Sequence, residues 1–192
     1  QDVRDLPSVS ERLQPSQANE LAYLQYTSGS TRFPRGVMIT QETVMNNLSS
    51  MSKYGSRLRP GDRAMSWLPY FHDMGLVGLV LGPMASQISV DYLCTRDFAM
   101  RPRLRLKLIT QNRSTISSSP PFGYELCVKR LREKDIAQFD LSSWRLAGVG
   151  AEPIRLEPLM QFADLLAPAG FHKNALVACY GMAECSLAVS FA

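Results

Sequence analysis

The sequence predicts an α/β fold in which largely parallel sheets are flanked by helices. Short runs rich in apolar and β-branched residues alternate with longer segments whose apolar residues recur at helical spacing. Glycine, proline, serine and aspartate residues punctuate the joins between these segments. Strands that alternate with helices of about ten residues form βα units, and such units favour parallel pairing of the strands.

The first part of the chain is expected to contain a linker, two strands and a helix. Residues 1–20 show no periodicity and are interpreted as a linker or loop. A β-rich run at 21–27 leads into a Ser/Thr/Gly segment, and a second strand is expected at 36–40. Thr40 is placed to cap a helix over 41–54.

The rest of the chain continues this alternation without an internal repeat. Strands are expected at 63–68, 88–94, 114–119, 144–150, 175–181 and 186–192. Helices are expected at 74–84, 102–111, 124–134 and 155–166, with a Pro-Pro-Phe-Gly loop before the third. Gly75, Gly78 and Gly82 give the first of these helices a small-residue face suited to close packing.

The composition is that of a globular protein and excludes a disordered chain. Of its 192 residues, 45% are hydrophobic and 20% are charged. The net charge of +4 is mild, and the densest basic stretch, 101–107, alternates arginine and lysine with leucine instead of aromatic residues. A solvated helix face is therefore favoured over an anion-binding patch, and no nucleic-acid partner is expected.

The cysteines and apolar runs predict a reduced protein without a membrane anchor. Cys94, Cys127, Cys179 and Cys185 lack the spacing of a zinc site and are interpreted as buried thiols of a cytoplasmic protein. The longest apolar run, 74–85, is shorter than the ~20 residues of a membrane helix, so no transmembrane segment is expected.

The segment YTSGSTRFPRGV, residues 26–37, has the composition of a loop that turns N–H groups and hydroxyls towards phosphate. A mobile surface loop has a similar composition, so both interpretations stay open. Two known phosphate motifs are excluded. The Walker motif needs a lysine where Val37 follows Gly36, and the dinucleotide motif needs a glycine where Pro153 stands.

Three further segments place polar residues at the ends of predicted strands, where ligands bind in α/β folds. WLPYFHDMGL contains His72, one of two histidines; GVGAEPI contains Glu152; and CYGMAE contains Tyr180 and Glu184. A tyrosine ring stacks on a purine, and a carboxylate near phosphates holds Mg²⁺. Each residue alone also fits a structural role, such as a packed aromatic ring for Tyr180.

Together and in this order, the four segments resemble those of the adenylate-forming enzymes, the superfamily of acyl-CoA synthetases, luciferases and nonribosomal-peptide adenylation domains. The sequence is most similar to the fatty acyl-AMP ligases, whose motifs read much like QYTSGSTRFPRGVMIT, WLPYFHDMGLVG, PPFGYELCVKR and YGMAECSL. The resemblance covers roughly 21–192. It implies part of the large N-terminal AMP-binding domain, with the small C-terminal lobe absent from this chain.

The resemblance implies a role for each matching residue. The β- and γ-phosphates of ATP would be wrapped by Thr27, Ser28, Gly29, Ser30 and Thr31. Arg35 would supply positive charge where the family usually has lysine, and Arg32 replaces a common glycine. His72 would lie beside the acyl carboxylate and the α-phosphate.

The same resemblance implies an adenine site and a metal ligand. The adenine site would be formed by Gly150, Ala151, Glu152, Tyr180, Gly181, Met182 and Ala183, with the ring of Tyr180 stacked on the base. Glu184 would bind Mg²⁺. Ala183 stands where most of the superfamily has threonine, and alanine there is typical of the fatty acyl-AMP ligases.

The implied reaction joins a fatty acid to the α-phosphate of ATP and releases pyrophosphate. Both reactants are anions, so the site must neutralise and align them, and a carboxylate already ionised at neutral pH needs no general base. ATP and Mg²⁺ are the implied cofactors, and an acyl carrier protein or polyketide synthase is the implied acceptor of the acyl group in lipid or polyketide synthesis.

Candidates for an apolar tunnel that holds the acyl chain are Phe122, Gly123 and Tyr124, together with the glycine face of the helix after His72. Composition alone favours ordinary core for these residues.

Two alternative functions stay open. A long-chain acyl-CoA synthetase shares every site residue, although Ala183 weighs against it. The other alternative is a non-catalytic domain of a multidomain protein that binds acyl adenylate or acts as a scaffold. The presence of His72 and Glu184 weighs against it. The resemblance also implies a ribose-binding aspartate and a C-terminal lysine that this chain lacks, so the chain alone is expected to be inactive.

Overall fold

The computed structural model describes residues 14–27 and 33–192. Within them, a six-stranded sheet has the strand order β4-β3-β5-β6-β7-β8, and a separate antiparallel hairpin pairs β1 with β2. Pairing in the large sheet is parallel except between β7 and β8. The strands are β1 Leu21–Tyr26, β2 Gly36–Thr40, β3 Arg63–Ser66, β4 Ser89–Tyr92, β5 Ile116–Ser119, β6 Leu146–Val149, β7 Leu176–Gly181 and β8 Ala188–Phe191.

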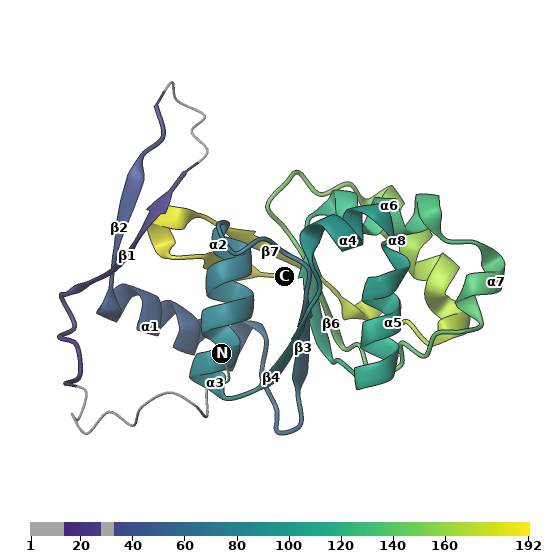
Figure 1. Ribbon diagram of the computed structural model, residues 1–192, viewed down its shortest axis with the longest axis horizontal. Helices are drawn as coiled ribbons and strands as arrows, with labels where there is room; N and C mark the ends of the chain where they lie inside the picture. Colours follow the sequence, from purple (N-terminus) through teal and green to yellow (C-terminus); the bar gives the residue numbers. More distant parts are fainter. Residues whose placement is uncertain (1–13, 28–32) are drawn as a thin grey trace, which may run out of the picture.

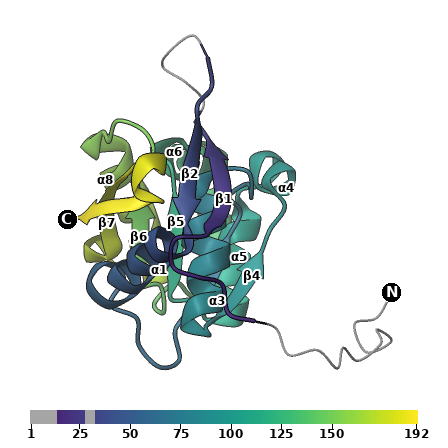
Figure 2. The same cartoon turned by 90° about the vertical axis from the view of Figure 1, so that its left-hand side faces the viewer.

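The large sheet separates two groups of helices (Figure 1). One face is covered by α4 to α8, and the other carries α1, α2, α3 and the hairpin (Figure 2). The helices are α1 Gln41–Ser50, α2 Asp73–Leu76, α3 Gly82–Ser86, α4 Thr95–Met100, α5 Arg103–Asn112, α6 Pro121–Arg130, α7 Glu133–Ile136 and α8 Leu156–Leu166. No helix in the described part of the chain has both the length and the hydrophobicity needed to cross a bilayer.

The predicted α/β class with a largely parallel sheet is confirmed, with local differences. A π-helical turn, Met51–Gly55, extends α1, and a second, Val77–Leu81, joins α2 to α3, so both predicted helices are continuous helical segments. The Pro-Pro-Phe-Gly loop is wrong, because α6 already begins at Pro121, a residue suited to the first turn of a helix. The short helices α4 and α7 were not predicted.

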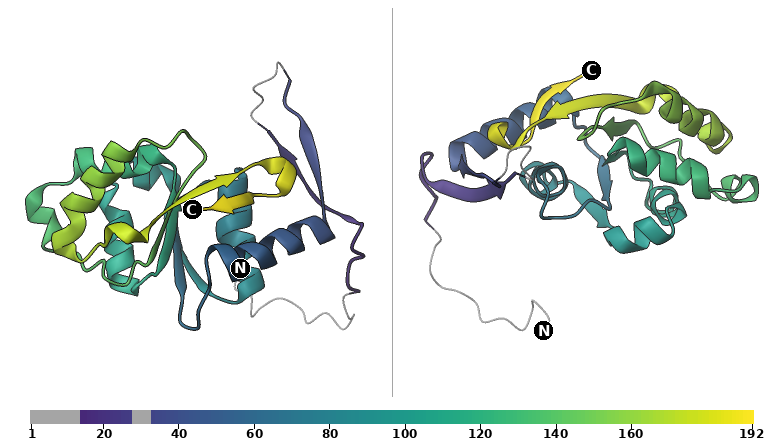
Figure 3. Two further views of the ribbon diagram at one scale, coloured as in Figure 1. Left: turned by 180° about the vertical axis from the view of Figure 1, so that it is seen from behind. Right: turned by 90° about the horizontal axis from the view of Figure 1, so that it is seen from above.

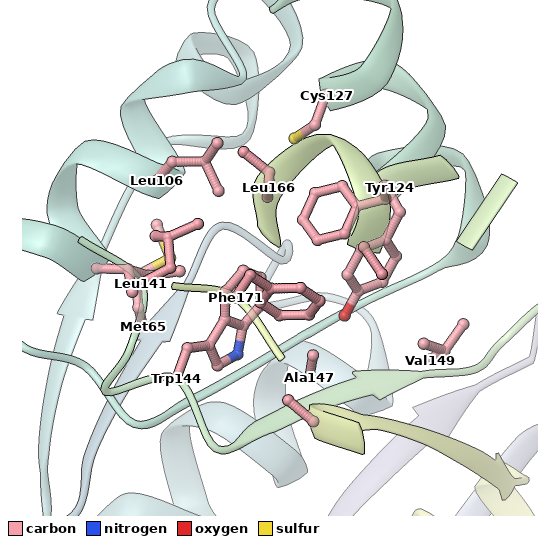
Figure 4. Close-up of a cluster of buried hydrophobic side chains, with 14 of the residues drawn as sticks. Met65, Leu106, Tyr124, Cys127, Leu141, Trp144, Ala147, Val149, Leu166 and Phe171 are labelled. Atoms are coloured by element: carbon pink, nitrogen blue, oxygen red, sulfur yellow. The ribbon is translucent and has the colours of Figure 1, made fainter. Parts of the chain in front are cut away.

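The main core lies between the sheet and helices α5, α6 and α8 (Figure 4). Aromatic rings dominate it. The ring centroids of Tyr124 and Phe162 lie 5.0 Å apart, and those of Trp144 and Phe171 lie 5.1 Å apart, both edge to face. Such contacts add about 0.5–1.5 kcal/mol each beyond the burial of apolar area.

The solvated face predicted for residues 101–107 is wrong at Arg105, which is fully buried. The helix turns Arg105 to the same side as Ile109, four residues later and also buried. The guanidinium lies 4.7 Å from the ring centroid of Trp144 and 4.9 Å from that of Tyr124, and its Nε donates to Ser117 Oγ at 3.2 Å. Arg105 is therefore a cation held in the core by aromatic faces.

The four cysteines are free thiols, as predicted, but they are not all buried. Cys127 is buried in the main core, and this burial raises the pKa of its thiol to about 11. Cys94 and Cys185 are exposed because each lies in a connection between elements. The predicted burial is wrong for these two.

A second, smaller core joins the hairpin to α1 and to the π-helical turn after α2. Its buried residues are Ile39, Val44, Leu48, Met51 and Val77. The predicted cap at Thr40 is confirmed, since the Thr43 N–H donates to Thr40 Oγ1 at 3.2 Å. The glycines after His72 do permit close packing, because a Cβ at Gly75 would lie 2.1 Å from the carbonyl oxygen of Pro69.

An ionic network closes the amino-terminal edge of the sheet. Arg145 pairs with Asp62 and also donates to the backbone carbonyls of Ser56 and Arg57 at 3.1 and 3.2 Å. Burial disfavours ionisation of Asp62, but hydrogen bonds from Arg145 and Thr115 outweigh it and hold the pKa of this carboxyl below its usual range. One ion pair thus ties the start of β6 to the turn before β3.

We expect Arg145→Met to lower the free energy of unfolding by about 3 kcal/mol at pH 7, because it leaves a buried carboxylate without its partner. The folded-state pKa of Asp62 is depressed, so the ionised carboxylate stabilises the folded protein. This contribution to the free energy of unfolding is fully present above about pH 4 and is lost as the pH falls through the folded-state pKa. Urea unfolding of both proteins from pH 7 downwards measures the difference.

The matched control is Arg101→Met, which removes an exposed pair with Asp97 and is expected to cost no more than about 0.5 kcal/mol. Equal losses in the two variants, or a wild-type advantage over Arg145→Met that does not shrink in acid, would contradict this account of the network.

Candidate functional site

A cavity of about 230 Å³ lies between the large sheet and the helical segment that follows His72. Its walls come from β5, β6 and β7, from the π-helical turn Val77–Leu81 and from β8. Segments far apart in sequence meet there, and Figure 3 shows β7 and β8 extending across to the side that carries α1. The cavity therefore runs along one face of the sheet, from Ile116 and Leu146 at the starts of β5 and β6 to Gly150 and Tyr180 at the carboxyl ends of β6 and β7, where ligands bind in open α/β sheets.

The cavity has a polar opening and an apolar interior. His72 has a side chain 52% exposed and Tyr180 is 60% exposed, so both stand at the opening. Leu79, Ile116 and Leu146 also line the cavity and are only 4–6% exposed. A molecule with a charged head and an apolar tail matches this division.

The end of β6 approaches β7 so closely that glycine is required. A Cβ at Gly150 would lie 2.6 Å from the carbonyl oxygen of Cys179. The next residue, Ala151, has φ +68°, a left-handed backbone conformation that residues other than glycine rarely adopt. Strained backbone of this kind is concentrated at functional sites, and both residues line the cavity.

His72 precedes α2 and pairs with its neighbour Asp73. His72 Nδ1 lies 2.8 Å from Asp73 Oδ1 and 3.3 Å from the Met74 nitrogen, but the Met74 N–H has a shorter contact, 2.7 Å, to Asp73 Oδ1. Nδ1 therefore carries the proton and donates a hydrogen bond to the Asp73 carboxylate. This leaves Nε2 available to a ligand. The hydrogen bond to Asp73 raises the pKa of His72, and burial partly opposes this.

Tyr180 and Gly181 end β7 at the opening of the cavity. With 60% of its surface exposed, Tyr180 is not the packed aromatic that the alternative interpretation required. A Cβ at Gly181 would lie 2.1 Å from the carbonyl oxygen of Leu187, so this position admits only glycine. The exposed ring leaves one face for stacking on a ligand.

The predicted phosphate loop joins the two strands of the hairpin. The Thr27 N–H donates to the carbonyl oxygen of Arg35 at 3.0 Å and closes the base of the loop. Gln25, buried in β1, donates to the carbonyl oxygen of Phe71 at 3.4 Å and so ties the hairpin to the turn that carries His72. The loop residues Ser28, Gly29, Ser30, Thr31 and Arg32 lie outside the described residues.

Glu184 lies at the tip of a turn that connects β7 to β8 and is exposed. Among the described residues, no group of three or more His, Cys, Asp or Glu side chains is arranged to hold a metal. Mg²⁺ commonly takes only one or two carboxylates and completes its shell with phosphate oxygens and water. A single exposed carboxylate such as Glu184 is compatible with a Mg²⁺ ion shared with a nucleotide.

The structure brings five predicted site residues together around the cavity. The lining includes His72, Gly150, Ala151, Tyr180 and Gly181. The predicted residues outside the lining are Thr27, Arg35, Glu152, Met182, Ala183 and Glu184. Of these, Ala183 is buried, and Arg35, Glu152 and Glu184 are exposed.

Neither Phe122 nor Tyr124 lines the cavity, so an acyl tunnel at these residues stays a prediction. Tyr124 is fully buried on the other face of the sheet, where its hydroxyl donates to the carbonyl oxygen of Gly148 at 2.8 Å. The helical segment after His72 does contribute to the cavity wall, through Gly78. Sequence reasoning missed Ile116 and Leu146 as lining residues. The available signal was the alternation along each strand, which puts Ile116 and Leu146 on the face opposite to that of Ser117 and Ala147.

The strand order, the cavity at the strand ends and the hairpin loop define the class of protein, the N-terminal lobe of the adenylate-forming enzymes. Comparison with protein families gives the particular family. The AMP-binding enzyme family matches residues 2–192, and this chain belongs to it.

Solved structures of related proteins share the fold. A chain from structural and functional studies of fatty acyl-adenylate ligases from E. coli and L. pneumophila has 59% sequence identity and a TM-score of 0.92, over 98% of this chain and 34% of that one. The fatty acyl-adenylate ligase from L. pneumophila, in complex with acyl adenylate and pyrophosphate, has 41% identity and a TM-score of 0.88, over 93% of this chain and 32% of that one.

Curated relatives carry ligase and synthetase names. A protein of Caulobacter vibrioides named "Putative acyl-CoA synthetase" is 46% identical over 99% of this chain and 33% of its own length. The medium-chain-fatty-acid acyl-carrier-protein ligase JamA of Moorena producens is 40% identical over 95% of this chain and 31% of its own. The chain thus spans about a third of the length of the curated relatives it matches.

We expect the pKa of His72 to lie above the ordinary value of about 6.5 and to fall in Asp73→Asn, which removes the charge that stabilises the imidazolium. The stabilisation from this pair is fully present below pH 6.5 and is lost as the pH rises through the folded-state value. NMR titration measures it, with His172→Gln as background so that one imidazole remains.

Asp97→Asn, a change at an exposed aspartate on α4, is the matched control and is expected to leave the titration of His72 unchanged. A His72 pKa below 6.5, or one that Asp73→Asn does not lower, would contradict the assigned proton on Nδ1.

Proposed function

We propose that this chain is part of an enzyme that activates a fatty acid as its acyl adenylate. ATP supplies the adenylyl group, pyrophosphate leaves, and the acyl group then passes to the thiol of an acyl carrier protein. Residues 21–192 form part of the N-terminal AMP-binding domain in this proposal, residues 1–20 lead into it, and a C-terminal lobe lies outside this chain. A cytoplasmic location is also proposed, since free thiols suit a reducing compartment.

The cavity with a polar opening and an apolar interior carries this proposal. A fatty acid would place its carboxylate beside His72 and its tail against Leu79, Ile116 and Leu146. Each methylene group removed from water contributes about 0.8 kcal/mol, which favours an acyl chain over a short polar acid. The names of relatives in the fatty-acid ligase group support the same substrate class.

The side chains at the opening suit a reaction between two anions. His72, whose pKa is raised, carries more positive charge near neutral pH than an ordinary histidine and would balance the carboxylate and the α-phosphate. Tyr180 would stack on the adenine next to the backbone of Gly150 and Ala151. Alignment of the reactants and neutralisation of charge are then the main contributions of this chain.

The phosphate groups would be held from the hairpin and from the turn after β7. Thr27 and Arg35 stand at the base of the hairpin loop, and Arg35 would oppose the charge of the departing pyrophosphate. Glu184 would hold Mg²⁺, which lowers the charge of the phosphates when it is bound with ATP.

A long-chain acyl-CoA synthetase is the second candidate. The name of the Caulobacter vibrioides relative favours it. Ala183 favours the ligase, because its buried methyl group offers no hydroxyl next to Glu184.

The first test uses a longer protein that contains this chain and the remaining length found in its relatives. With ATP, Mg²⁺ and a panel of fatty acids, we expect pyrophosphate release that depends on the fatty acid and acyl adenylate that accumulates even when CoA is present. Mass spectrometry of the products measures both.

Rapid conversion to acyl-CoA would select the synthetase instead. Failure of every fatty acid to release pyrophosphate would reject both enzymes and leave the non-catalytic binding domain.

The 192-residue chain alone is expected to show no fatty-acid-dependent pyrophosphate release above that of its Glu184→Ala variant. It spans a third of the relatives' length, so much of the electrostatic preorganisation around the reacting atoms is missing. A coupled pyrophosphate assay compares the two chains, and release near the rate of the longer protein would overturn this expectation.

A further inference from the structure

One side chain of α1 forms hydrogen bonds with the backbone next to the turn that carries Glu184. The carboxamide of Asn47 makes two hydrogen bonds with the backbone of Ala188: Nδ2 donates to the Ala188 oxygen at 2.8 Å, and the Ala188 N–H donates to Oδ1 at 3.1 Å. The two residues are 141 positions apart in sequence. Asn47 therefore acts on this backbone as a neighbouring strand would, by satisfying donor and acceptor together.

Ala188 stands at the base of the Glu184 turn. It pairs with Gly181 in the β7–β8 ladder, and the Met182 N–H donates to the Leu187 oxygen at 2.8 Å to close the turn above it. Ala183 is buried within the turn, while Glu184 points from its tip with an exposed side chain. The position of Ala188 therefore sets the position of Glu184.

The backbone of this turn is strained at Ser186, so contacts from outside the turn are needed to stabilise it. Ser186 is fully buried with φ +68° and ψ −57°, a region that residues other than glycine avoid. The hydroxyls of Ser186 and of Tyr23 on β1 are buried without a hydrogen bond of normal geometry. Burial raises the pKa of Tyr23, and the nearby Ser186 hydroxyl opposes this, so the two groups lie close together. Backbone hydrogen bonds close the turn internally, from Met182 N–H to Leu187 O and from Cys185 N–H to Met182 O, and the two bonds to Asn47 tie its base to α1.

We propose that Asn47 is a positioning residue that fixes the Glu184 turn, so that the Glu184 carboxylate meets a Mg²⁺ ion bound with ATP. This inference rests on the proposed function, in which Glu184 is the protein ligand of the metal. Asn47 reaches neither the metal nor the nucleotide and acts only through the backbone of Ala188.

The chain itself supplies the variants for a test. Asn47→Ala removes both hydrogen bonds, and Asn47→Asp keeps the acceptor for the Ala188 N–H but loses the donor to the Ala188 oxygen. The adjacent, exposed Asn46 gives the matched control Asn46→Ala on the same helix. Glu184→Gln reports the contribution of the carboxylate itself.

The measurement is the affinity for ATP, by isothermal titration, in Mg²⁺ and again in EDTA. In the longer protein that contains this chain, we expect the wild type to bind ATP more tightly in Mg²⁺ than in EDTA, and Asn47→Ala to reduce this metal-dependent gain by about tenfold, as loss of a group that orients a metal ligand does. Affinity in EDTA should stay within about twofold in the same variant, and Asn46→Ala should match wild type in both conditions.

The Asp variant and thermal unfolding separate positioning from a loss of fold. Asn47→Asp should also reduce the metal-dependent gain, even where its unfolding temperature lies close to wild type. A purely structural role would instead weaken ATP binding equally with and without Mg²⁺ and would overturn the inference.

The remaining outcomes distinguish this inference from the proposed function. If Glu184→Gln removes the metal-dependent gain and neither Asn47 variant does, only the positioning role fails. If the wild type shows no metal-dependent gain, or Glu184→Gln keeps it, the metal assignment of Glu184 fails and the inference fails with it.

Discussion

Parallel pairing of β3, β5, β6 and β7 is the constraint on which the rest of this structure depends. Parallel strands finish at the same edge, so the turns that follow them are brought together whatever their separation in sequence. His72 follows β3, Gly150 follows β6 and Tyr180 belongs to the end of β7. The return from β3 to β4 crosses one face through α2 and α3 and encloses the cavity there, while α5, α6 and α8 pack the aromatic core on the other face.

Local patterns in the sequence predict the elements well because local physics decides them. The Thr40 side chain caps α1 by a bond within four residues, and alternation of side chains fixes which residues of β5 and β6 share a face of the sheet. Five of the candidate residues at or after strand ends line one cavity, and their role as ligand positions remains a prediction. The sites of the residues carried over only from the resemblance, such as Glu184, remain predictions.

Long-range packing decided the points on which sequence reasoning failed. Nothing near Arg105 in sequence indicates that Trp144 and Tyr124 will cover its guanidinium, because both rings come from later elements. Tyr124 takes the core position that composition favours, and its hydroxyl bonds to Gly148. The burial of Arg105 depends on rings from later elements, so no local pattern in the sequence predicts it.

Buried polar groups are satisfied to different degrees in different parts of the molecule. Asp62, at the amino-terminal ends of the strands, is bonded by Arg145, Thr115 and the Arg59 N–H. Among the described residues, the hydroxyls of Tyr23 and Ser186 lack partners, and so do Trp67 Nε1 and two guanidinium nitrogens of Arg105 in the main core. Positive φ values likewise occur at Ala151 and Ser186 and also at Gln87 and Arg113, which end helices α3 and α5. Strain alone therefore does not mark the candidate site, which is distinguished instead by the close approach of β6 to β7 at Gly150 and by the exposed ring of Tyr180.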